Sequence, residues 1–300
     1  MIRRLLQLLW GTGWCLLLVG ITLHLTVRDG IDSLVVVFYI MPLMVLLGLA
    51  LCLAFFRRGR RMALAFAALI LAGWTARSFT LHSPGPPNND EVRMLFWNLN
   101  RPTEPSQPLI DLIKELRPDF VSCDEPGINA ESNVAAYKAA LPGYDCQFMP
   151  RGILWLSRYP SKYRARGRLD SLGAYAVFDA ALQGRTQRFV TIDVYGPPML
   201  PRTGQLNEAL SFTNHDPKVI VLGDFNTPTE SVHFDPYRSE GLQDGLTAGN
   251  RGFRETWFYG LPLLSLDHIW LGKDWQVLEA RKIWKTNSDH AAVFVRARLR

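Results

Sequence analysis

Hydrophobic residues are unevenly distributed along this 300-residue chain, and the long apolar runs are confined to its first third. Residues 5–27 and 33–56 contain no Asp, Glu, Lys or Arg, and each exceeds the roughly 20 residues that cross the core of a bilayer. Residues 62–81 form a third run with Arg77 near its end, where a long side chain can reach the headgroups. The pattern predicts a membrane module over residues 1–82 with three transmembrane helices.

Basic residues set the expected orientation of this module. Arg3 and Arg4 precede the first run, and the segment RRGRR (57–61) separates the second run from the third. The positive-inside rule places both segments in the cytoplasm, so three crossings leave the rest of the chain outside a plasma or inner membrane. If the third run does not cross, the rest faces the cytoplasm instead. A cleaved signal peptide is an alternative for the first run, but its length and the lack of a small-x-small site after it favour a retained helix.

Beyond a linker rich in Pro, Gly and Asn (83–91), the chain changes to short segments typical of a folded α/β domain (92–300). Residues 1–89 hold 8 of the 33 basic and 2 of the 27 acidic residues, which leaves 25 of each in residues 90–300. The domain is therefore neutral and has no overall positive field that would attract a polyanion. Many predicted strands and few helices favour stacked sheets with helices outside. The expected strands are 94–98, 120–123, 153–156, 175–182, 187–194, 218–222, 266–271 and 291–295, and the expected helices are 109–116, 131–141 and 202–214.

Several of these strands begin or end in polar residues that can bind a metal or a phosphate. The strand at 120–123 runs into Asp124 and Glu125, and the strand at 218–222 runs into Asp224 and Asn226. Folding alone does not require carboxylates at the ends of apolar strands, because a buried charge is costly unless it is paired or bound to a metal. We therefore expect these strand ends to converge. The other polar residues at strand ends are Asn98, Asp267, His268, Asp289 and His290.

Six segments, in their order along the chain, resemble the endonuclease/exonuclease/phosphatase superfamily of divalent-metal phosphoesterases. Either GDFN or SDH alone would be a weak signal, but six ordered motifs covering about residues 92–298 are hard to obtain by chance. The resemblance implies a four-layer α/β/β/α sandwich of two mostly antiparallel sheets, with the site at one end of both sheets. The segments are MLFWNLN (94–100), DFVSCDEPG (119–127), GILWLSRYP (152–160), VLGDFNTPTES (221–231), SLDHIW (265–270) and SDHAAVF (288–294).

The resemblance also implies a metal site. Glu125 matches the metal-binding glutamate of the family, Asn98 would lie close to the same ion or to the phosphate, and Asp289 would lie near the metal. Carboxylates with retained waters suit Mg²⁺, which demands octahedral oxygen ligands, and Mn²⁺ is the expected substitute. Such a cation would neutralise the charge that grows on a phosphoester under attack.

Catalytic roles are implied for four further residues. Asp224 would orient the nucleophilic water and Asn226 would donate to a phosphoryl oxygen. His290 would manage protons, with Asp267 as its carboxylate partner. Each of these residues taken singly is also common in turns or cores, and it is their joint order that favours the catalytic roles. His268, which follows Asp267 on a strand, should face the other way and is expected to be structural.

Two departures from the family pattern lie near this site. Many members carry a histidine on the strand that matches residues 189–195, where this chain has none. Tyr195, in a Tyr-x-Pro like that of the apurinic-endonuclease branch, is the expected phosphate contact, and Asp193 is the alternative. Asp124 stands where a glutamine is usual, and strand alternation should turn it away from the ion. The missing histidine leaves a second function open, that of a catalytically inactive, membrane-bound binding module.

The sequence therefore predicts a membrane-anchored, Mg²⁺-dependent phosphoesterase that contacts the lipid bilayer and acts on a nucleic-acid or lipid-linked phosphoester; it identifies no protein partner. Cys123 and Cys146 would form a disulfide in an oxidising compartment or remain two free thiols. The domain has one basic cluster, which we interpret as a charged edge strand, with a phosphate-contact surface as the alternative. The cluster comprises Arg158, Lys162, Arg164, Arg166 and Arg168.

Overall fold

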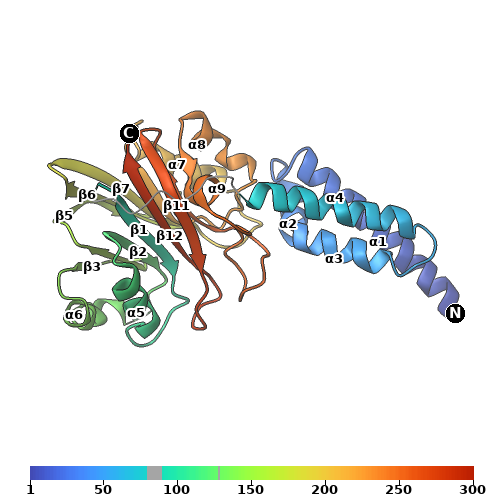
Figure 1. The fold of residues 1–300 in the computed structure, drawn as a ribbon, viewed down its shortest axis with the longest axis horizontal. Helices are drawn as coiled ribbons and strands as arrows, with labels where there is room; N and C mark the ends of the chain where they lie inside the picture. The colour runs from blue at the N-terminus through green and yellow to red at the C-terminus, as the bar shows by residue number, and fades with distance from the viewer. Residues whose placement is uncertain (80–89, 128) are drawn as a thin grey trace.

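The computed structural model of the chain describes residues 1–79, 90–127 and 129–300, and it divides into a helical bundle and a domain of two sheets (Figure 1). The bundle extends away from the domain, and the N-terminus lies at its far tip. The domain begins after residue 90. Most of the predicted linker (83–89) lies outside the described residues.

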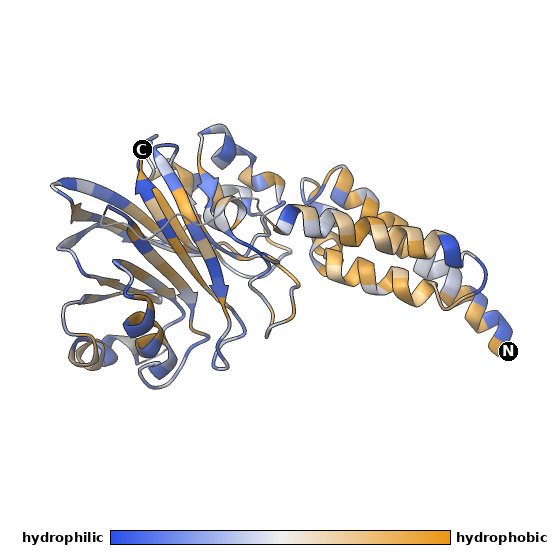
Figure 2. Cartoon of the chain, viewed as in Figure 1, coloured by the Kyte–Doolittle hydropathy of each residue, from blue (hydrophilic) through white to orange (hydrophobic). Residues whose placement is uncertain are grey.

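The helices of the bundle pack together because their facing sides carry apolar and small residues. Leu17, Leu46 and Ala63 come from three different helices. All three are fully buried and belong to one apolar cluster. The outward sides are also apolar, and Figure 2 shows this colouring along most of the bundle, with hydrophilic residues concentrated at its tip. The helices are α1 (Ile2–Leu25), α2 (Val35–Ile40), α3 (Leu43–Leu53) and α4 (Arg60–Ser78), with a short 3₁₀ turn at Asp32–Leu34.

The second predicted span, residues 33–56, is not one continuous helix. Proline cannot donate the backbone N–H that a continuing helix needs, and its ring clashes with the preceding turn. Pro42 accordingly separates α2 from α3, and the helical segments on either side of it are bent by 65°. The helix predicted over residues 33–56 is therefore interrupted at Pro42, and its crossing of a membrane stays a prediction.

Among the residues that the structure describes, α1 is the one helix that is long and apolar enough to cross a membrane by itself. α2 and α3 would form a second span only if the two bent helices together are counted as a single span. α4 covers most of the third predicted span (62–81), but it includes Arg60, Arg61 and Arg77 within 19 residues. Three crossings therefore remain a prediction.

The described part of the domain forms two six-stranded mixed sheets. The first has the order β11-β12-β1-β2-β4-β3 and the second has the order β5-β6-β7-β8-β10-β9. β1 with β2 and β7 with β8 are the parallel pairs, and the other neighbours are antiparallel. The strands are β1 (Val92–Asn98), β2 (Phe120–Asp124), β3 (Asp145–Met149), β4 (Ile153–Ser157), β5 (Ser161–Gly167), β6 (Ala174–Leu182), β7 (Arg185–Asp193), β8 (Ile220–Asp224), β9 (Gln243–Asp244), β10 (Asp267–Leu271), β11 (Trp275–Ile283) and β12 (Ala292–Leu299).

Helices cover the outer face of each sheet and complete an α/β/β/α sandwich, as predicted. α5 buries Leu109, Leu112 and Leu116 against the first sheet, an i, i+3, i+7 stripe that keeps its other side polar. Aromatic side chains fill the space between the sheets, where the Trp155 and Phe178 rings stack with centroids 4.4 Å apart. The helices of the domain are α5 (Gln107–Leu116), α6 (Ala130–Ala140), α7 (Thr203–Ser211), α8 (Asp235–Ser239) and α9 (Gly245–Gly249), with a 3₁₀ turn at Val232–Phe234.

The strands that the sequence pattern misses are the edge strands β3, β9 and β11 of the described sheets. The fourth edge strand, β5, has the sequence SKYRARG and is mostly exposed, and it contains Lys162, Arg164 and Arg166 of the basic cluster that we interpret as a charged edge strand. Charge on an edge strand hinders pairing with a further chain. β5 lies on the side of the domain away from the helical bundle (Figure 1), so the cluster does not face the predicted membrane.

Cys123 and Cys146 are free buried thiols.

The bundle is joined to the domain by apolar packing and by polar contacts. Phe38 and Tyr39 of α2 share an apolar cluster with Leu264 and Leu266 of the domain. The Tyr39 hydroxyl donates to the main-chain carbonyl of Asn226 at 3.3 Å, so the bundle contacts a residue of the predicted site directly. Further contacts link Arg77 to Glu255 (3.1 Å) and Glu230 (3.3 Å), Trp74 to Glu255 (2.7 Å) and Arg28 to Asp235 (2.9 Å).

Candidate active site

A polar cleft of about 450 Å³ opens where strands of both sheets begin or end. The strand register explains this meeting, because Asn98 is opposite Asp124 across β1 and β2, while Asp224 is opposite both Asp193 of β7 and Asp267 of β10. Polar strand ends from two packed sheets are thereby placed at one edge of the sandwich. Of the predicted site residues, Asn98, Glu125, Tyr195, Asp224, Asn226, Asp289 and His290 line the cleft.

His290 is held by a carboxylate behind it. Its Nδ1 lies 2.9 Å from Asp267 Oδ2 and 3.1 Å from Oδ1, and Asp267 is fully buried. His290 Nε2 lies 3.9 Å from Asp224 Oδ2, too far for a hydrogen bond, so this nitrogen is available to a group in the cleft. The ring orientation is therefore fixed by Asp267, and the free edge of the ring points to the same space as Asp224.

Asp224 is the most heavily bonded carboxylate of the cleft. Asn98 Nδ2 donates to its Oδ2 at 3.0 Å, and the backbone N–H of Asn226 donates to its Oδ1 at 2.8 Å. The Asp224 N–H in turn donates to Asp124 Oδ2 at 3.0 Å. Asn226 has a positive φ of 45°, a conformation that asparagine tolerates, and its Nδ2 donates to the Val194 carbonyl at 2.8 Å. This network fixes both oxygens of Asp224 relative to the cleft.

Glu125 and Asp289 occupy the side of the cleft near β1 and β2. Glu125 follows β2 with a φ of 49°, and its carboxylate forms an ion pair of 2.9 Å with the exposed Arg101. Asp289 Oδ2 accepts a hydrogen bond from Trp257 Nε1 at 3.0 Å. Each carboxylate therefore has one oxygen engaged by a protein donor, which leaves the other oxygen available to a ligand in the cleft.

Both candidates for the position of the missing histidine line the cleft. Tyr195 is 45% exposed, and its backbone is fixed by Gln205, which accepts from the Tyr195 N–H at 3.0 Å, and by Arg202, which donates to the Tyr195 carbonyl. Asp193 ends β7 and is half-buried beside Asp224. The two residues lie at the same wall and do not exclude one another.

The charges of the cleft are unbalanced toward negative. Burial and repulsion by Asp267 raise the pKa of Asp224 to about 7. Burial raises the pKa values of Asp124 and Asp193 well above their ordinary range; repulsion by Asp193 adds to this at Asp124, and repulsion by Asp224 and Glu125 adds to it at Asp193. For His290, burial acts to lower the pKa, but Asp267 and Asp224 outweigh it and raise the pKa to about 10. The histidine is therefore cationic at neutral pH, while the surrounding acids remain short of positive partners.

The donor set fits a divalent cation. Hard oxygen donors dominate the polar lining of the cleft, among them the carboxylates of Glu125 and Asp289 and the amide of Asn98. One ligand atom from each of Asp224, Asp267 and His290 also lies within 4.8 Å of the others, but the hydrogen bond between His290 and Asp267 and the positive charge of the ring suit these three residues to proton transfer rather than to metal binding. A bound cation would offset the repulsion that raises the pKa of Asp224.

Two polar residues next to the site, His268 and Asp124, point away from the cleft, as strand alternation predicts. His268 faces away from His290, as expected, and its ring bonds to Asp244 (3.2 Å) and to the Thr227 carbonyl (3.0 Å). Asp124 does not line the cleft, but it lies beneath it, bonded to the Asp224 amide. Sequence reasoning did not single out Arg101 and Arg151, which also line the cleft. Neither arginine belongs to a periodic pattern or motif that could have indicated it.

Two packed mixed sheets with helices outside, and an acidic cleft with a His–Asp pair at their edge, are the features of an α/β-sandwich phosphoesterase. The sequence model of the endonuclease/exonuclease/phosphatase family matches residues 95–290, about two thirds of the chain, so this protein belongs to that family. Members of the family are hydrolases that act on phosphoesters. No curated protein matches the chain closely enough to be significant.

Solved structures share the fold at low sequence identity. An endonuclease/exonuclease/phosphatase family protein from Bacteroides thetaiotaomicron is 15% identical with a TM-score of 0.54, and the match covers 73% of this chain and all of that one. A Neisseria 3′ phosphatase solved with a product DNA hairpin is 18% identical with a TM-score of 0.56, over 68% and 98% of the two chains. A mannosyl-6-phosphatase from Bacteroides thetaiotaomicron is 16% identical with a TM-score of 0.51, over 69% and 99%. At such identities the likeness extends to the fold alone.

Proposed function

We propose that this protein is a membrane-anchored, divalent-metal-dependent phosphodiesterase whose active site is the cleft between the two sheets. The observation that carries the proposal is the His290–Asp267 pair directed at Asp224, with Asn98 and Asn226 beside it. A cationic histidine, an aspartate that titrates near neutral pH and two amides are the groups that phosphoester hydrolysis needs at one point.

Glu125, Asn98 and Asp289 would hold the cation, with Mg²⁺ favoured by their oxygen donors and Mn²⁺ as its substitute. When bound, the cation supplies charge neutralisation at the non-bridging phosphate oxygens. The protein residues do the rest: Asp224 orients the attacking water and accepts its proton, and the pKa near 7 allows it to be ionised at neutral pH. His290 donates its Nε2 proton to the substrate oxygen that becomes negative, and Asp267 stabilises the imidazolium beforehand. Proton return from Asp224 to His290 restores the starting state.

The wall of the cleft opposite the histidine would contact the substrate phosphate. Asn226 keeps one amide hydrogen for this purpose, because Nδ2 has two and Val194 accepts one. The Tyr195 hydroxyl is exposed at the same wall, and Arg101 and Arg151 add positive charge at its margin. These neutral and cationic donors match a phosphodiester anion, while the neutral surface of the domain does not favour strong non-specific binding to long polyanions.

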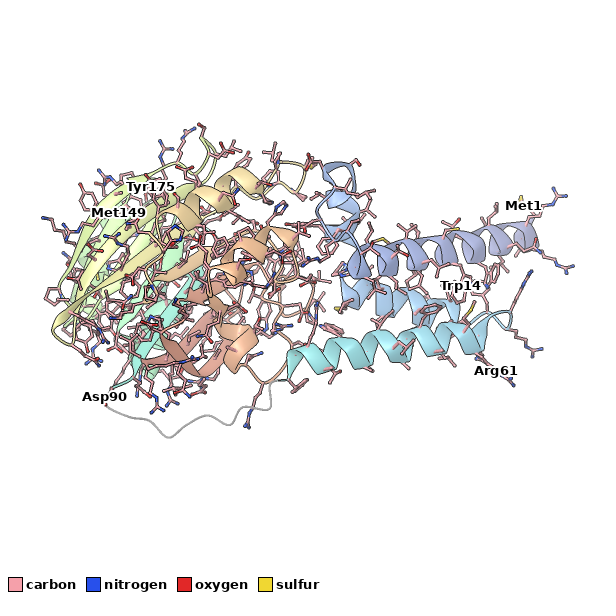
Figure 3. The ribbon with its side chains drawn as sticks, turned by 90° about the horizontal axis from the view of Figure 1, so that it is seen from above. Met1, Trp14, Arg61, Asp90, Met149 and Tyr175 are labelled. Carbon is pink, nitrogen blue, oxygen red and sulfur yellow. The ribbon has the colours of Figure 1, made fainter. Side chains whose placement is uncertain are left out.

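Anchoring in a membrane is the second part of the proposal. Large apolar side chains project outward along the bundle, which is unusual for a surface in water. Arg3, Arg58 and Trp10 line one pocket at the tip, and Arg58 lies over the Trp10 ring at 5.0 Å, so the basic segments are gathered at one end. Figure 3 places Met1 and Arg61 at this end, away from the domain. With the tip in the cytoplasm, the catalytic domain would be extracytoplasmic. Exposed large apolar residues of the bundle include Leu8, Leu9, Leu25, Phe55 and Leu69.

The full-length protein, purified in detergent, tests the proposed activity. We expect hydrolysis of bis-(p-nitrophenyl) phosphate in Mg²⁺ that EDTA abolishes and that Mg²⁺ restores. A panel of plasmid DNA, single-stranded DNA and phospholipids in the same buffer identifies the substrate class. Absence of turnover on every substrate with Mg²⁺ or Mn²⁺ would support instead the inactive binding module that the missing histidine suggests.

A further inference from the structure

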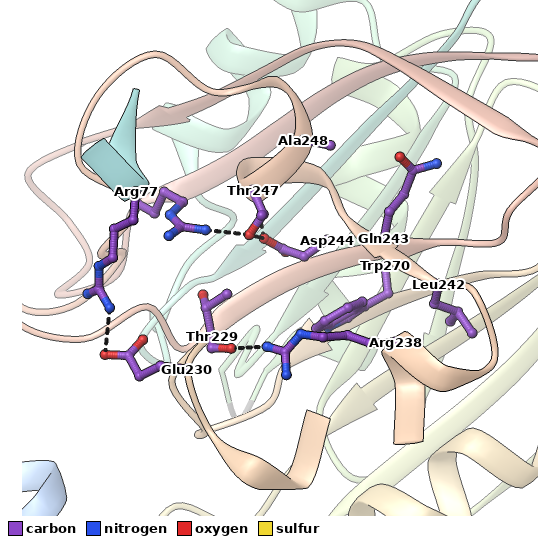
Figure 4. A pocket seen from close by; sticks show the side chains of 11 residues that line it. Arg77, Thr229, Glu230, Arg238, Leu242, Gln243, Asp244, Thr247, Ala248 and Trp270 are labelled. Carbon is purple, nitrogen blue, oxygen red and sulfur yellow. Dashed lines mark hydrogen bonds and ion pairs between the residues drawn. The ribbon is translucent and has the colours of Figure 1, made fainter. Parts of the chain in front are cut away.

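A second cavity, of about 420 Å³, lies at the junction of the bundle and the domain (Figure 4). It shares no lining residue with the catalytic cleft. Arg77 from the end of α4 and Arg238 and Arg254 from the domain line it, together with the acidic residues Glu230 and Asp244. Three guanidinium groups around one cavity are an unusual concentration of positive charge in a domain that is neutral overall.

Arg254 is the residue that distinguishes this cavity. It is 9% exposed, and within the described residues its side-chain hydrogen bond runs from Nη1 to the Thr247 hydroxyl at 2.6 Å. No carboxylate in the described ranges lies within 4 Å of its guanidinium. A buried charge without an ionic partner is destabilising, and burial accordingly lowers the pKa of Arg254 despite the attraction of Asp244. The described part of the protein therefore provides no counter-ion in direct contact with the Arg254 guanidinium.

The acidic residues of the cavity do not fill this role, because other groups already engage them. Glu230 forms an ion pair with Arg77 at 3.3 Å. Asp244 accepts from the Thr247 hydroxyl at 2.6 Å and is paired with His268 at 3.2 Å. Figure 4 shows Glu230 directed toward Arg77 and Asp244 directed toward Thr247.

Arg238 lines the cavity, and contacts with other protein groups fix its position. It lies over the Trp270 ring at 5.9 Å, donates to the Thr229 carbonyl and pairs with Asp235 at 2.7 Å. Arg77 and Arg238 are paired with Glu255 and Asp235 from outside the lining, so Arg254 is the lining arginine without an ion pair within 4 Å among the described residues. The positions of Arg238 and Arg77 are thus preset by protein contacts, and an anion of small size would complete the site.

We propose that this cavity binds a phosphate group. Guanidinium forks match the oxygens of phosphate in geometry and charge, and three of them around a small cavity suit a tetrahedral anion better than a planar carboxylate. Arg77 also lines an apolar groove of about 350 Å³ between α1, α3 and α4. A phosphate in the cavity could thus be that of a lipid headgroup or a free phosphate, and the experiment separates the two sources.

Thermal unfolding of the full-length protein in detergent with EDTA provides the test. Inorganic phosphate at ten times its dissociation constant is expected to raise the Tm of the wild-type protein by about 3–5 °C. Arg254→Met keeps the aliphatic stem but removes the charge, so its Tm without phosphate should equal or exceed that of the wild type, and phosphate should not raise it. Arg281→Met, which removes a half-exposed arginine paired with Glu279 on β11, is the matched control and should keep the full phosphate shift.

The lipid arm repeats the measurement in nanodiscs of phosphatidylcholine with or without phosphatidylglycerol. A rise in Tm that needs phosphatidylglycerol and disappears in Arg254→Met assigns the cavity to a lipid headgroup, whereas a rise with inorganic phosphate alone assigns it to a free anion. If Arg254→Met does not fold, Arg254→Lys replaces it and should require about tenfold more phosphate for half of the shift. Full phosphate shifts in these Arg254 variants, or no shift of the wild type in either arm, would overturn the proposal.

Discussion

Asp267→Asn removes the charge behind His290, the proposed catalytic histidine, while it preserves the shape of a fully buried side chain. Asp267 Oδ2 lies 2.9 Å from His290 Nδ1, a charge-assisted hydrogen bond of about 1.5–3 kcal/mol. This hydrogen bond holds the His290 ring in the orientation that leaves Nε2 free toward the cleft, and each 1.36 kcal/mol lost from that positioning costs a factor of ten in rate. We therefore expect kcat on bis-(p-nitrophenyl) phosphate in Mg²⁺ to decrease by about 10- to 150-fold.

The control for this prediction is a buried carboxylate outside the cleft. Asp179 pairs with arginines on β5 and β7 at 2.8 and 3.1 Å, so Asp179→Asn also removes a buried charge but should leave kcat within about twofold of the wild type. Thermal unfolding confirms that both variants are folded. An unchanged kcat in folded Asp267→Asn, or an equal loss in Asp179→Asn, would refute the role given to the His–Asp pair.

Three further predictions concern stability, the junction and the missing histidine. Burial acts to raise the pKa of Asp179, but hydrogen bonds from two arginines outweigh it and lower the pKa; Asp179→Asn should therefore reduce the free energy of unfolding by about 1 kcal/mol at pH 7. This difference should disappear as the pH falls below about 4 toward the lowered pKa, and denaturant titrations that show a constant difference would contradict it. Phe38→Ala should destabilise the protein by about 3–5 kcal/mol, because Phe38 is buried at the junction, whereas Leu64→Ala at an exposed position of α4 should cost less than about 1 kcal/mol in the same denaturant titration. Tyr195→Phe should lower kcat/KM by about tenfold if the hydroxyl contacts phosphate, and a larger loss in Asp193→Asn than in Tyr195→Phe would assign the position of the missing histidine to Asp193.

The interior of the fold could be predicted from the sequence because strands buried on both faces need apolar residues throughout. β1, β2, β4 and β8 agree with the predicted segments within two residues at each end. The missed strands β3, β9 and β11 and the charged strand β5 are at the sheet edges, where backbone pairing with one neighbour holds a strand whose side chains are not uniformly apolar. Local pattern does not record that kind of stabilisation.

The residues of the candidate site could be named from the sequence, but their mutual support could not. Motif positions indicate Asp224 and His290, whereas the hydrogen bond from the Asp224 amide to Asp124 depends on how the two sheets pack. Strand alternation gave no role to Asp124, because β2 ends at that residue and Glu125 adopts a φ of 49°, which breaks the pleat. The contact of Tyr39 with Asn226 joins residues 187 positions apart and has no local signal.

The most direct test of the central claim, that side chains from 98 to 290 surround one cation and one phosphate, is the Mg²⁺ concentration for half-maximal turnover in two variants. Glu125→Gln removes a ligand charge and should raise this concentration by at least about tenfold, with turnover partly recovered in excess Mg²⁺. Asp267→Asn should lower the maximal rate and leave the Mg²⁺ requirement within about twofold of the wild type. An unchanged Mg²⁺ requirement in active, folded Glu125→Gln would contradict the proposed site.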